Sequence, residues 1–276
     1  MVNPSQQGPL PSDPIAILTD FGYRDHYVGV MKGVIARIAP GAEVIDITHG
    51  IPPQSVASGA LVLSQAWRFF PPRTIFLAVV DPGVGTARLP IAIATRSGAR
   101  FVGPDNGLLA EAATAAGIEQ MVELRTPRYR LAATSSTFHG RDIFAPAAAW
   151  IARGTRLDAL GPRVATVTPL ESSAAITKAG RTLIGSVVYV DTFGNLVTNL
   201  SREAVEAFAG RVPQDRLSVR LGRRGPLALG VTYGDVPRGT ALALFGSFAM
   251  LEIAVREDDA ARLLKAGVGD RVVVNK

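Results

Sequence analysis

Short apolar runs alternate with longer segments of helical periodicity along residues 15–153. Several of these runs are rich in β-branched residues and too short for helices, which is typical of buried strands. They predict strands at 15–18, 43–48, 74–80, 90–95, 100–102 and 120–124. Apolar residues spaced by three and four predict helices between them, at 25–38 with Asp25 as N-cap, at 54–70, at 108–116, and from 143 to Gly154. This alternation favours a mostly parallel sheet with helices on both faces.

The pattern changes after residue 181. Short apolar runs bounded by Gly, Asn, Asp or Pro predict strands at 184–190, 196–200, 217–221, 227–231, 241–245 and 251–255. A predicted helix at 257–266 and a predicted strand at 271–274 follow them. Many short strands with turn residues between them indicate a barrel or a sandwich. The expected fold class is α/β, with an N-terminal mostly parallel sheet and flanking helices plus a C-terminal all-β barrel-like domain.

The expected domain organisation follows from these two patterns. It comprises a flexible N-terminal tail at 1–14, an α/β domain with the catalytic residues at 15–160, a linker at 161–181, and a β-barrel domain at 182–276. The tail is rich in Pro, Ser and Gln and lacks the charged and then apolar plan of a signal peptide. No apolar run approaches the roughly 18 residues that suggest a membrane-spanning helix. The sequence therefore predicts a cytoplasmic protein.

Composition excludes several kinds of site. The chain of 276 residues is 47% hydrophobic and 19% charged, as in ordinary globular proteins. It contains no cysteine, which excludes disulfides, thiolate nucleophiles and zinc–thiolate sites. The histidines His26, His49 and His139 are not spaced as pairs of metal ligands on one helix. We therefore expect no metal site.

A net charge of +6 raises the alternative of a nucleic-acid partner. The densest basic group lies in turn-like, glycine-punctuated sequence, without the interleaved aromatics of single-strand binders, and comprises Arg211, Arg216, Arg220, Arg223 and Arg224. Solvated basic loops explain such a group as well. We expect neither a nucleic acid nor a membrane as partner.

Candidate chemistry begins where the run 74–80 ends, at Asp81. Pro82-Gly83 and a second glycine, Gly85, follow the carboxylate, and Arg88 stands seven residues after it. In open α/β sheets, ligands bind at the carboxyl ends of the strands, and glycines let the backbone turn tightly and approach a ligand. The alternative is an acidic strand cap followed by a turn and an exposed arginine.

Two further polar residues lie at predicted strand or helix ends. Asp20 follows the first strand, and His139 precedes the helix that begins near Asp142. Each has a structural explanation, since Asp20 suits the cap of a strand-to-helix turn and His139 a helix cap. Together with Asp81 and Arg88, however, they could orient and deprotonate a water without a metal.

The barrel-like half carries a second polar constellation. Asp191, Phe193 and Asn195 lie on one predicted hairpin loop, where Phe-Gly-Asn also makes a good turn. An amide beside a flat apolar ring could recognise adenine. Ser247 and Glu252 offer a hydroxyl and a carboxylate that could hold the two ends of an amino acid.

These motifs together resemble one enzyme family over nearly the whole chain, from about residue 15 to 274. The resemblance is to the S-adenosyl-L-methionine (SAM) hydroxide adenosyltransferases, the water-using relatives of the 5′-fluorinase and 5′-chlorinase. The motifs that carry it are Thr19-Asp20-Phe21-Gly22, Asp81-Pro82-Gly83-Val84-Gly85-Thr86-x-Arg88, Gly103-Pro104-Asp105-Asn106-Gly107, Thr137-Phe138-His139-Gly140-Arg141-Asp142, Asp191-x-Phe193-Gly194-Asn195 and Leu251-Glu252-Ile253-Ala254-Val255.

The resemblance implies an α/β domain and a C-terminal β-barrel in a homotrimer that binds its ligand between neighbouring subunits. It implies cleavage of SAM by water to adenosine and L-methionine, with SAM as substrate and no cofactor. Carried over by motif, the water-activating residues would be Asp81, Arg88 and His139. The substrate-binding residues would be Asp20 for the ribose diol, Asn195 for adenine with Phe193 as a stacking surface, and Asp191, Ser247 and Glu252 for the methionine end.

Two sequence features bear on the choice within the family. The halogenases resemble this chain but have a tyrosine at the place of Asp81 and a non-histidine at that of His139, so this chain has the hydrolytic set. Conversely, residues 246–250 depart from the Asn-Ser-x-Gly-x pattern associated with the family, with Ala249 where a glycine is common. The alternatives to a SAM hydrolase are a 5′-halogenase of the same fold, a non-catalytic adenosine- or SAM-binding protein, and a nucleic-acid module.

Overall fold

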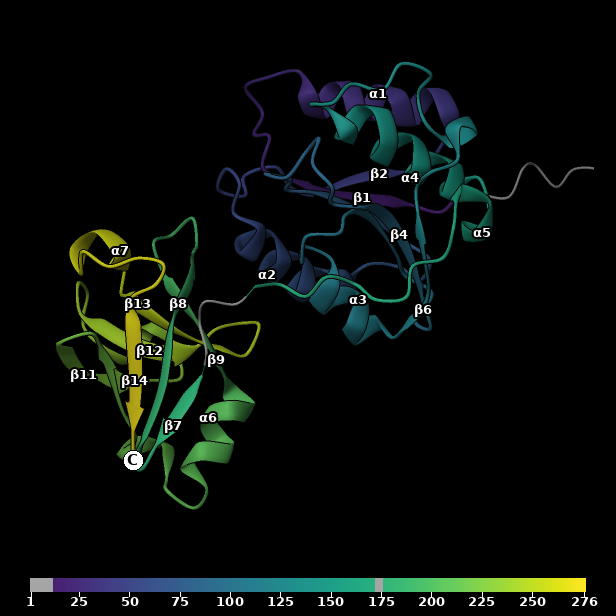
Figure 1. Ribbon diagram of the computed structural model, residues 1–276. Coiled ribbons are helices and arrows are strands. Elements are labelled where there is room, and N and C mark those ends of the chain that lie inside the picture. The colour runs from purple at the N-terminus through teal and green to yellow at the C-terminus, as the bar shows by residue number, and fades with distance from the viewer. Residues whose placement is uncertain (1–11, 172–175) are drawn as a thin grey trace, which may run out of the picture. The chain divides into compact units, whose positions relative to one another are not determined.

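A computed structural model describes residues 12–171 and 176–276 (Figure 1). The chain divides into two compact units between Glu171 and Ser172, within the stretch expected to be a linker. Strand β7 (Thr177–Ala179), in that same stretch, pairs with the barrel strand that follows it. Of the flexible tail predicted at 1–14, residues 1–11 lie outside the described residues.

The first unit contains a sheet that is mostly parallel, as predicted. Its strand order is β2-β1-β3-β5-β4-β6. The pairs β1–β2, β1–β3 and β3–β5 are parallel, whereas β4 runs antiparallel to both of its neighbours. The bounds are β1 Ile15–Thr19, β2 Val44–Thr48, β3 Ile75–Val79, β4 Pro90–Thr95, β5 Arg100–Pro104 and β6 Ile118–Glu123.

Helices cover both faces of this sheet, with α1 and α4 on one side and α2 and α3 on the other (Figure 1). Alternate residues of each central strand pack on opposite faces, so that Ile75, Leu77 and Val79 contact the first pair of helices while Phe76 and Ala78 contact the second. The helices are α1 Tyr27–Ile38, α2 Val56–Ala66, α3 Ala110–Ala116, α4 Ala145–Ala152 and the short α5 Leu157–Leu160.

Two of the predicted helices have ends that differ from the prediction. The first helix starts at Tyr27 after His26 as N-cap, without a side-chain cap bond, so Asp25 is not its cap. In the loop before it, the Gly22 N–H bonds to the carbonyl of His49 at 2.8 Å. The second helix begins later than predicted, where Ser55 caps α2, and it ends at Ala66 in a 3₁₀ turn.

The second unit is a closed β-barrel. Its sheet order is β14-β10-β11-β12-β13-β9-β8-β7, and β14 also pairs with β8, which closes the barrel. The inward side chains, among them Leu196, Val219, Ile253 and Val272, form one buried core. The further strands are β8 Thr182–Val190, β9 Leu196–Ser201, β10 Ser218–Leu221, β11 Arg224–Leu229, β12 Ala241–Phe245, β13 Met250–Val255 and β14 Arg271–Asn275.

The helices of the barrel unit differ from those predicted. Helix α6 (Arg202–Ala209) was not predicted, although Ser201 caps it and it buries Val205 and Phe208. The helix predicted at 257–266 is only the single turn α7 (Ala260–Leu263). Pairing of Val255 with Asp258 holds the chain in a tight turn just before it.

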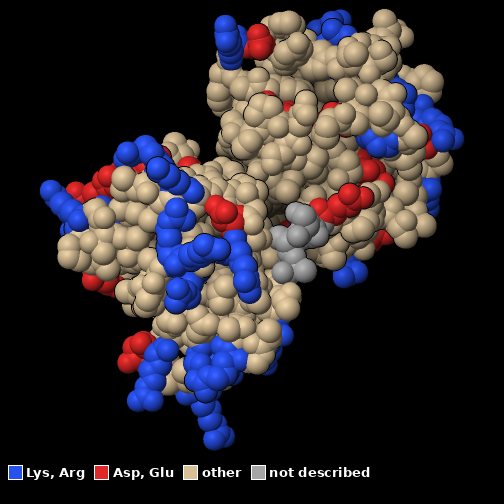
Figure 2. All heavy atoms as spheres, turned by 60° about the vertical axis from the view of Figure 1, so that its left-hand side comes forward, with Lys and Arg blue, Asp and Glu red and all other residues tan. Residues whose placement is uncertain are grey.

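Basic side chains gather on the visible face of the barrel unit (Figure 2). The five arginines noted in the sequence are all solvent exposed. Arg220 belongs to β10, within the strand predicted at 217–221, whereas Arg224 begins β11 and does not lie in a turn. Among the helices of residues 12–171 and 176–276, none is long and apolar enough to cross a membrane.

Candidate active site

A cavity of about 380 Å³ opens at the carboxyl edge of the parallel strands. Asp20 follows β1 and Asp81 follows β3, and these strands are neighbours, so the two carboxylates reach the same edge. His139 lines the same cavity from the loop before α4. Three of the predicted site residues therefore share one cavity, in the place where open α/β sheets bind ligands.

Arg88 joins Asp81 and His139 through a single guanidinium. Its Nε lies 3.0 and 3.1 Å from the two carboxylate oxygens of Asp81, and its Nη2 donates to Asp81 Oδ2. The same Nη2 lies 2.8 Å from His139 Nδ1. The side chains of Arg88 and Asp81 are only 9% and 6% exposed, so the pair is shielded from solvent screening.

The contact with Arg88 fixes the tautomer of His139. A guanidinium only donates hydrogen bonds, so Nδ1 of the neutral ring accepts and Nε2 carries the proton. Burial lowers the pKa of His139, and the positive charge of Arg88 lowers it further, against the smaller opposing effect of Asp81. The imidazole is therefore neutral at pH 7.

The 81–88 loop is shaped by its own short-range bonds. The Val84 N–H bonds to the Asp81 carbonyl at 3.2 Å, and the Thr86 hydroxyl bonds to the Gly83 carbonyl at 2.7 Å. Gly85 has a φ of 78°, and a Cβ there would lie 2.7 Å from the carbonyl oxygen of Ser136. Glycine thus lets this loop pack against the loop that carries His139.

A buried carboxylate anchors the His139 loop. Asp142 is fully buried within a π-helical turn, Gly140–Phe144, that leads into α4. Its carboxylate accepts the Ser135 N–H at 2.7 Å and pairs with Arg141. Burial alone would raise the pKa of Asp142, but these donors lower it overall. Asp142 is therefore a charged support for the loop, and π-helical turns are frequent at functional sites.

One carboxylate oxygen of Asp20 has a structural role. Its Oδ2 accepts the backbone N–H of Gln54 at 2.8 Å, and Gln54 itself adopts a left-handed φ of 64°. Pro53 and Gln54 line the cavity together with the rings of Phe21, Tyr27 and Phe138. These residues were not among the predicted site residues. The sequence signal that could have identified them was the aromatic residues Phe21 and Tyr27 soon after Asp20, together with Phe138 next to His139.

In the barrel unit, Asp191 holds the loop that was predicted to recognise adenine. Its Oδ1 accepts the backbone N–H groups of Phe193 and Asn195 at 2.9 and 2.8 Å, and its Oδ2 accepts the Asn195 side-chain amide at 2.9 Å. Asn195 is buried, whereas the Phe193 ring is 78% exposed. Asp191 thereby orients Asn195 and presents an apolar ring to solvent.

Glu252 lies close enough to Asp191 for the two charges to interact, and its carboxylate accepts the Tyr233 hydroxyl at 2.5 Å. Burial raises the pKa of Glu252, and the charge of Asp191 adds to this rise against the bond from Tyr233. A Cβ at Gly246 would lie 2.3 Å from Glu252 Oε2, so the backbone before the exposed Ser247 packs on this carboxylate. Sequence reasoning missed Tyr233, because nothing in the spacing links it to Glu252.

Ala249 keeps the turn that glycine is expected to make. Its φ is 57°, its N–H bonds to the Gly246 carbonyl at 2.9 Å, and Gly246 in turn bonds to Met250 at 3.0 Å. Position 249 therefore carries an alanine where the family pattern has a glycine, but the backbone still adopts the left-handed turn.

Ala249→Gly is expected to stabilise the barrel. The left-handed conformation costs alanine about 1–2 kcal/mol, and the greater freedom of glycine in the unfolded chain offsets roughly 0.4–1 kcal/mol of that gain. Denaturant unfolding should show a free energy of unfolding higher by about 0.5–1 kcal/mol. The matched control is Ala228→Gly, at an exposed position of β11, which should lower it. A loss of stability in both variants would contradict the prediction.

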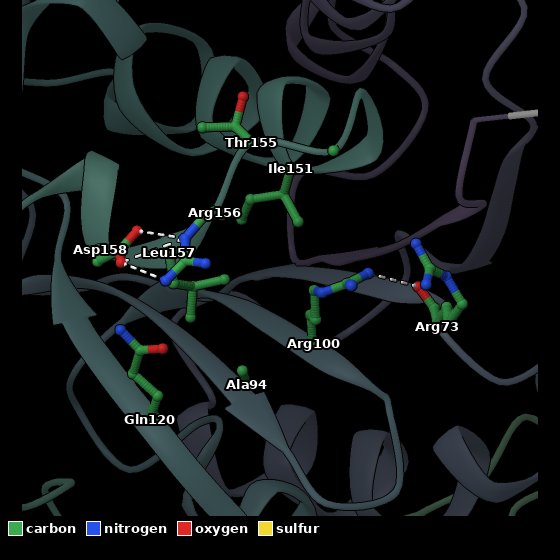
Figure 3. A pocket seen from close by; sticks show the side chains of 10 residues that line it. Arg73, Ala94, Arg100, Gln120, Ile151, Thr155, Arg156, Leu157 and Asp158 are labelled. Atoms are coloured by element: carbon green, nitrogen blue, oxygen red, sulfur yellow. Dashed lines mark hydrogen bonds and ion pairs between the residues drawn. The ribbon is translucent and has the colours of Figure 1, made fainter. Parts of the chain in front are cut away.

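A second cavity, of about 250 Å³, lies at the opposite edge of the sheet (Figure 3). Its arginines are paired with aspartates. Arg73 and Arg100 both bind Asp13, at 2.8 and 2.7 Å, and Arg156 binds Asp158 at 2.8 Å. None of the predicted site residues lines this cavity. Among the described residues, no group of three or more His, Cys, Asp or Glu side chains is arranged to hold a metal ion.

The geometry agrees with the family comparison. Models of the SAM hydroxide adenosyltransferase N-terminal and C-terminal domains match residues 15–161 and 185–273. The chain belongs to this family. The match covers both the Asp81–Arg88–His139 cluster and the Asp191–Glu252 region.

Individual relatives include hydrolases and halogenases. The chain is 40% identical over 259 residues to the (R)-S-adenosyl-L-methionine hydrolase of Thermus thermophilus, covering 91% of this chain and 95% of that one. It is 41% identical over 266 residues to the enzyme of the same name from Salinispora tropica, covering 96% and 98%. A fluorinase from Nocardia brasiliensis is 29% identical over 293 residues, covering 94% and 96%.

Solved structures show the same fold. A crystal structure of an uncharacterised conserved protein from Thermotoga maritima superposes with a TM-score of 0.85 at 40% identity, covering 94% of this chain and 99% of that one. A conserved hypothetical protein from Thermus thermophilus superposes with a TM-score of 0.75 at 36% identity, covering 95% and 99%.

Proposed function

We propose that this protein hydrolyses SAM by attack of water on the ribose C5′ carbon, giving adenosine and L-methionine. The observation that carries the proposal is the single guanidinium of Arg88 bound to both Asp81 and His139. Asp20, a carboxylate suited to a ribose diol, lines the same cavity. The names of the relatives at 40 and 41% identity support the substrate and suggest the (R) epimer at sulfur.

Catalysis of this reaction mainly requires activation of the nucleophile. Displacement at C5′ releases a neutral thioether from a sulfonium, so the leaving group needs no general acid. Water must instead be deprotonated and aligned with the C5′–sulfur bond, which is a task of proton transfer and positioning. Exclusion of bulk water from the site strengthens the attraction between a hydroxide-like nucleophile and the sulfonium.

Asp81 is the proton acceptor in this mechanism. Both of its oxygens bind Arg88, yet each retains a lone pair that can accept from water. The lone pair of His139 Nδ1 is engaged by Arg88, so the neutral ring serves first to hold the guanidinium. Arg88 then stabilises negative charge as it develops on the water oxygen.

The barrel unit supplies the remaining substrate contacts in this proposal. Asn195 would pair with adenine and the exposed ring of Phe193 would stack on it. Glu252 and Ser247 would hold the ammonium and carboxylate of the methionine end. Asp191 would contribute by holding Asn195 in place, in keeping with the three bonds that it accepts within its own loop.

We propose a homotrimer in the cytoplasm whose sites are completed at subunit interfaces, without a cofactor or a metal. The resemblance of the motifs to the family supports this assembly. Light scattering on the purified protein would test it. A trimeric mass is expected, and a monomer that is fully active would contradict it.

The halogenase alternative is disfavoured by charge. The negative charge of the Asp81 carboxylate would repel a halide brought to the position of the water. Fluorinase relatives are also less similar, at 29% identity.

Product analysis tests the proposed function. The protein is incubated with each sulfonium epimer of SAM, with and without chloride, and the products are separated by chromatography. We expect adenosine and methionine in equal amounts, faster from the (R) epimer and independent of chloride. A 5′-chloro-5′-deoxyadenosine product would establish the halogenase, and binding of adenosine without turnover would establish a sensor.

A further inference from the structure

His49 lies beneath the Asp20 loop, fully buried at the end of β2. Strands β1 and β2 are parallel neighbours in which Leu18 pairs with Thr48. The next residue of each strand is therefore brought alongside the other, and His49 Nδ1 lies 2.8 Å from Thr19 Oγ1. Thr19 is also fully buried and directly precedes Asp20.

Both residues bind the backbone that follows Asp20. Thr19 Oγ1 accepts the Phe21 N–H at 3.2 Å, and the His49 carbonyl accepts the Gly22 N–H at 2.8 Å. Since the Thr19 oxygen accepts from Phe21, its own proton is free to be donated to His49 Nδ1. The residues on both sides of Asp20 are therefore connected to His49. Thr19 and Gly22 bond to it directly, and Phe21 does so through Thr19.

A carboxylate faces the other ring nitrogen. His49 Nε2 lies 3.1 Å from Asp46 Oδ1, close enough for attraction but not aligned for a hydrogen bond. Burial alone would raise the pKa of Asp46, but Lys32 and His49 lower it overall. The ionised carboxylate favours a proton on Nε2, and Nδ1 then accepts from the Thr19 hydroxyl.

We infer that His49, acting through Thr19, is a positioning residue that fixes the Asp20 carboxylate for recognition of the ribose diol. This inference rests on the proposed role of Asp20 in ribose binding. One Asp20 oxygen is already bound to the Gln54 N–H, so the direction of the other depends on the backbone at 19–22. A histidine that merely filled the core would not affect how the protein distinguishes one ribose hydroxyl.

The test compares adenosine with 2′-deoxyadenosine by calorimetric titration. The wild-type protein should bind adenosine at least about tenfold more tightly, because a hydrogen bond to a charged group is lost with the 2′-hydroxyl. In Thr19→Val, which removes the hydroxyl but keeps the shape, this ratio should fall below about threefold. Thr19→Ser keeps the hydroxyl and should restore the wild-type ratio.

Thr74→Val is the matched control. Thr74 is fully buried at the other end of a neighbouring strand, and its hydroxyl bonds to the Pro71 carbonyl at 2.7 Å. This variant loses an equivalent bond and should keep the wild-type ratio. A Thr19→Val ratio equal to that of Thr74→Val would overturn the inference.

A second variant covers the case in which Thr19→Val does not fold. Asp46 has 28% of its side chain exposed, so Asp46→Asn should fold, and its ratio should fall about threefold. An unchanged ratio in Asp46→Asn would overturn the inference while the proposed function stands. A wild-type protein that binds neither nucleoside would instead overturn the role of Asp20 and the inference with it.

Discussion

Asp81→Asn is expected to lower kcat for SAM hydrolysis by about 10³-fold, the range of a lost general base. Asparagine keeps the shape and one acceptor for Arg88 but cannot take the proton of the attacking water. Adenosine affinity should stay within about twofold of the wild type, because Asp81 contributes to the reaction and not to ribose or adenine binding. Turnover is measured by chromatography and affinity by calorimetry on the same preparation.

Asp105→Asn is the control for this change. Asp105 follows β5 at the same edge of the sheet, where it accepts the backbone N–H and the hydroxyl of Thr168 at 2.8 and 2.9 Å. Its variant loses a charge nearby without touching the Arg88 cluster, and it should keep the wild-type kcat. Equal losses in the two variants would mean that Asp81 acts through the general charge or stability of this edge.

The second large effect concerns the pH dependence of the rate. Burial and the charge of Arg88 lower the pKa of His139 below its ordinary value of 6.5. Activity needs the neutral ring, which holds Arg88 through Nδ1, so the rate should fall as the pH falls through this lowered pKa. The acid limb of kcat/KM should therefore have its midpoint below pH 6.5, and activity should be level between that limb and pH 7.

Two substitutions at His139 separate holding Arg88 from accepting a proton. His139→Asn can still accept the Arg88 N–H at the place of Nδ1, so it should lose the acid limb and retain activity within about tenfold. His139→Leu removes the acceptor and should lose at least about 10² in kcat. An acid limb that persists unchanged in His139→Asn would show that another group sets it.

The α/β half could be predicted because its central strands, such as β1 and β3, are buried on both faces. The run 75–80 is apolar throughout, and its end at Asp81 marks the carboxyl edge without knowledge of the fold. Helix ends were less readable. Asp25 suits a cap by residue type, but the loop that it belongs to is tied to His49, a contact across more than twenty positions of sequence.

For the barrel half, the fold class could be predicted from the sequence, but the order of the strands in the sheet could not. The strands alternate inward and outward as their sequences indicate, whereas the closure of β14 on β8 pairs segments from the two ends of the unit. Helix α6 had a legible signal, since Ser201 caps it and its buried residues are spaced by three and four. The short strand-like runs on both sides of it, at 196–200 and 217–221, obscured that signal.

The motifs supplied the candidate site residues, but they did not show the bonds between them. The motifs grouped Asp81, Arg88 and His139, yet only the structure shows that one guanidinium binds both partners and thereby fixes the tautomer of His139. Tyr233 and Glu252 illustrate the limit most clearly, because no local pattern marks a bond between a turn residue and a residue within β13.

Water as the nucleophile is tested most directly by isotope labelling. The wild-type protein is incubated with SAM in water enriched in the heavy oxygen isotope, and the adenosine is analysed by mass spectrometry. Attack of water at C5′ predicts one heavy oxygen, located on the 5′-hydroxyl. Adenosine without the label at that position, or a halogenated nucleoside in its place, would contradict hydrolysis by the Asp81–Arg88–His139 cluster.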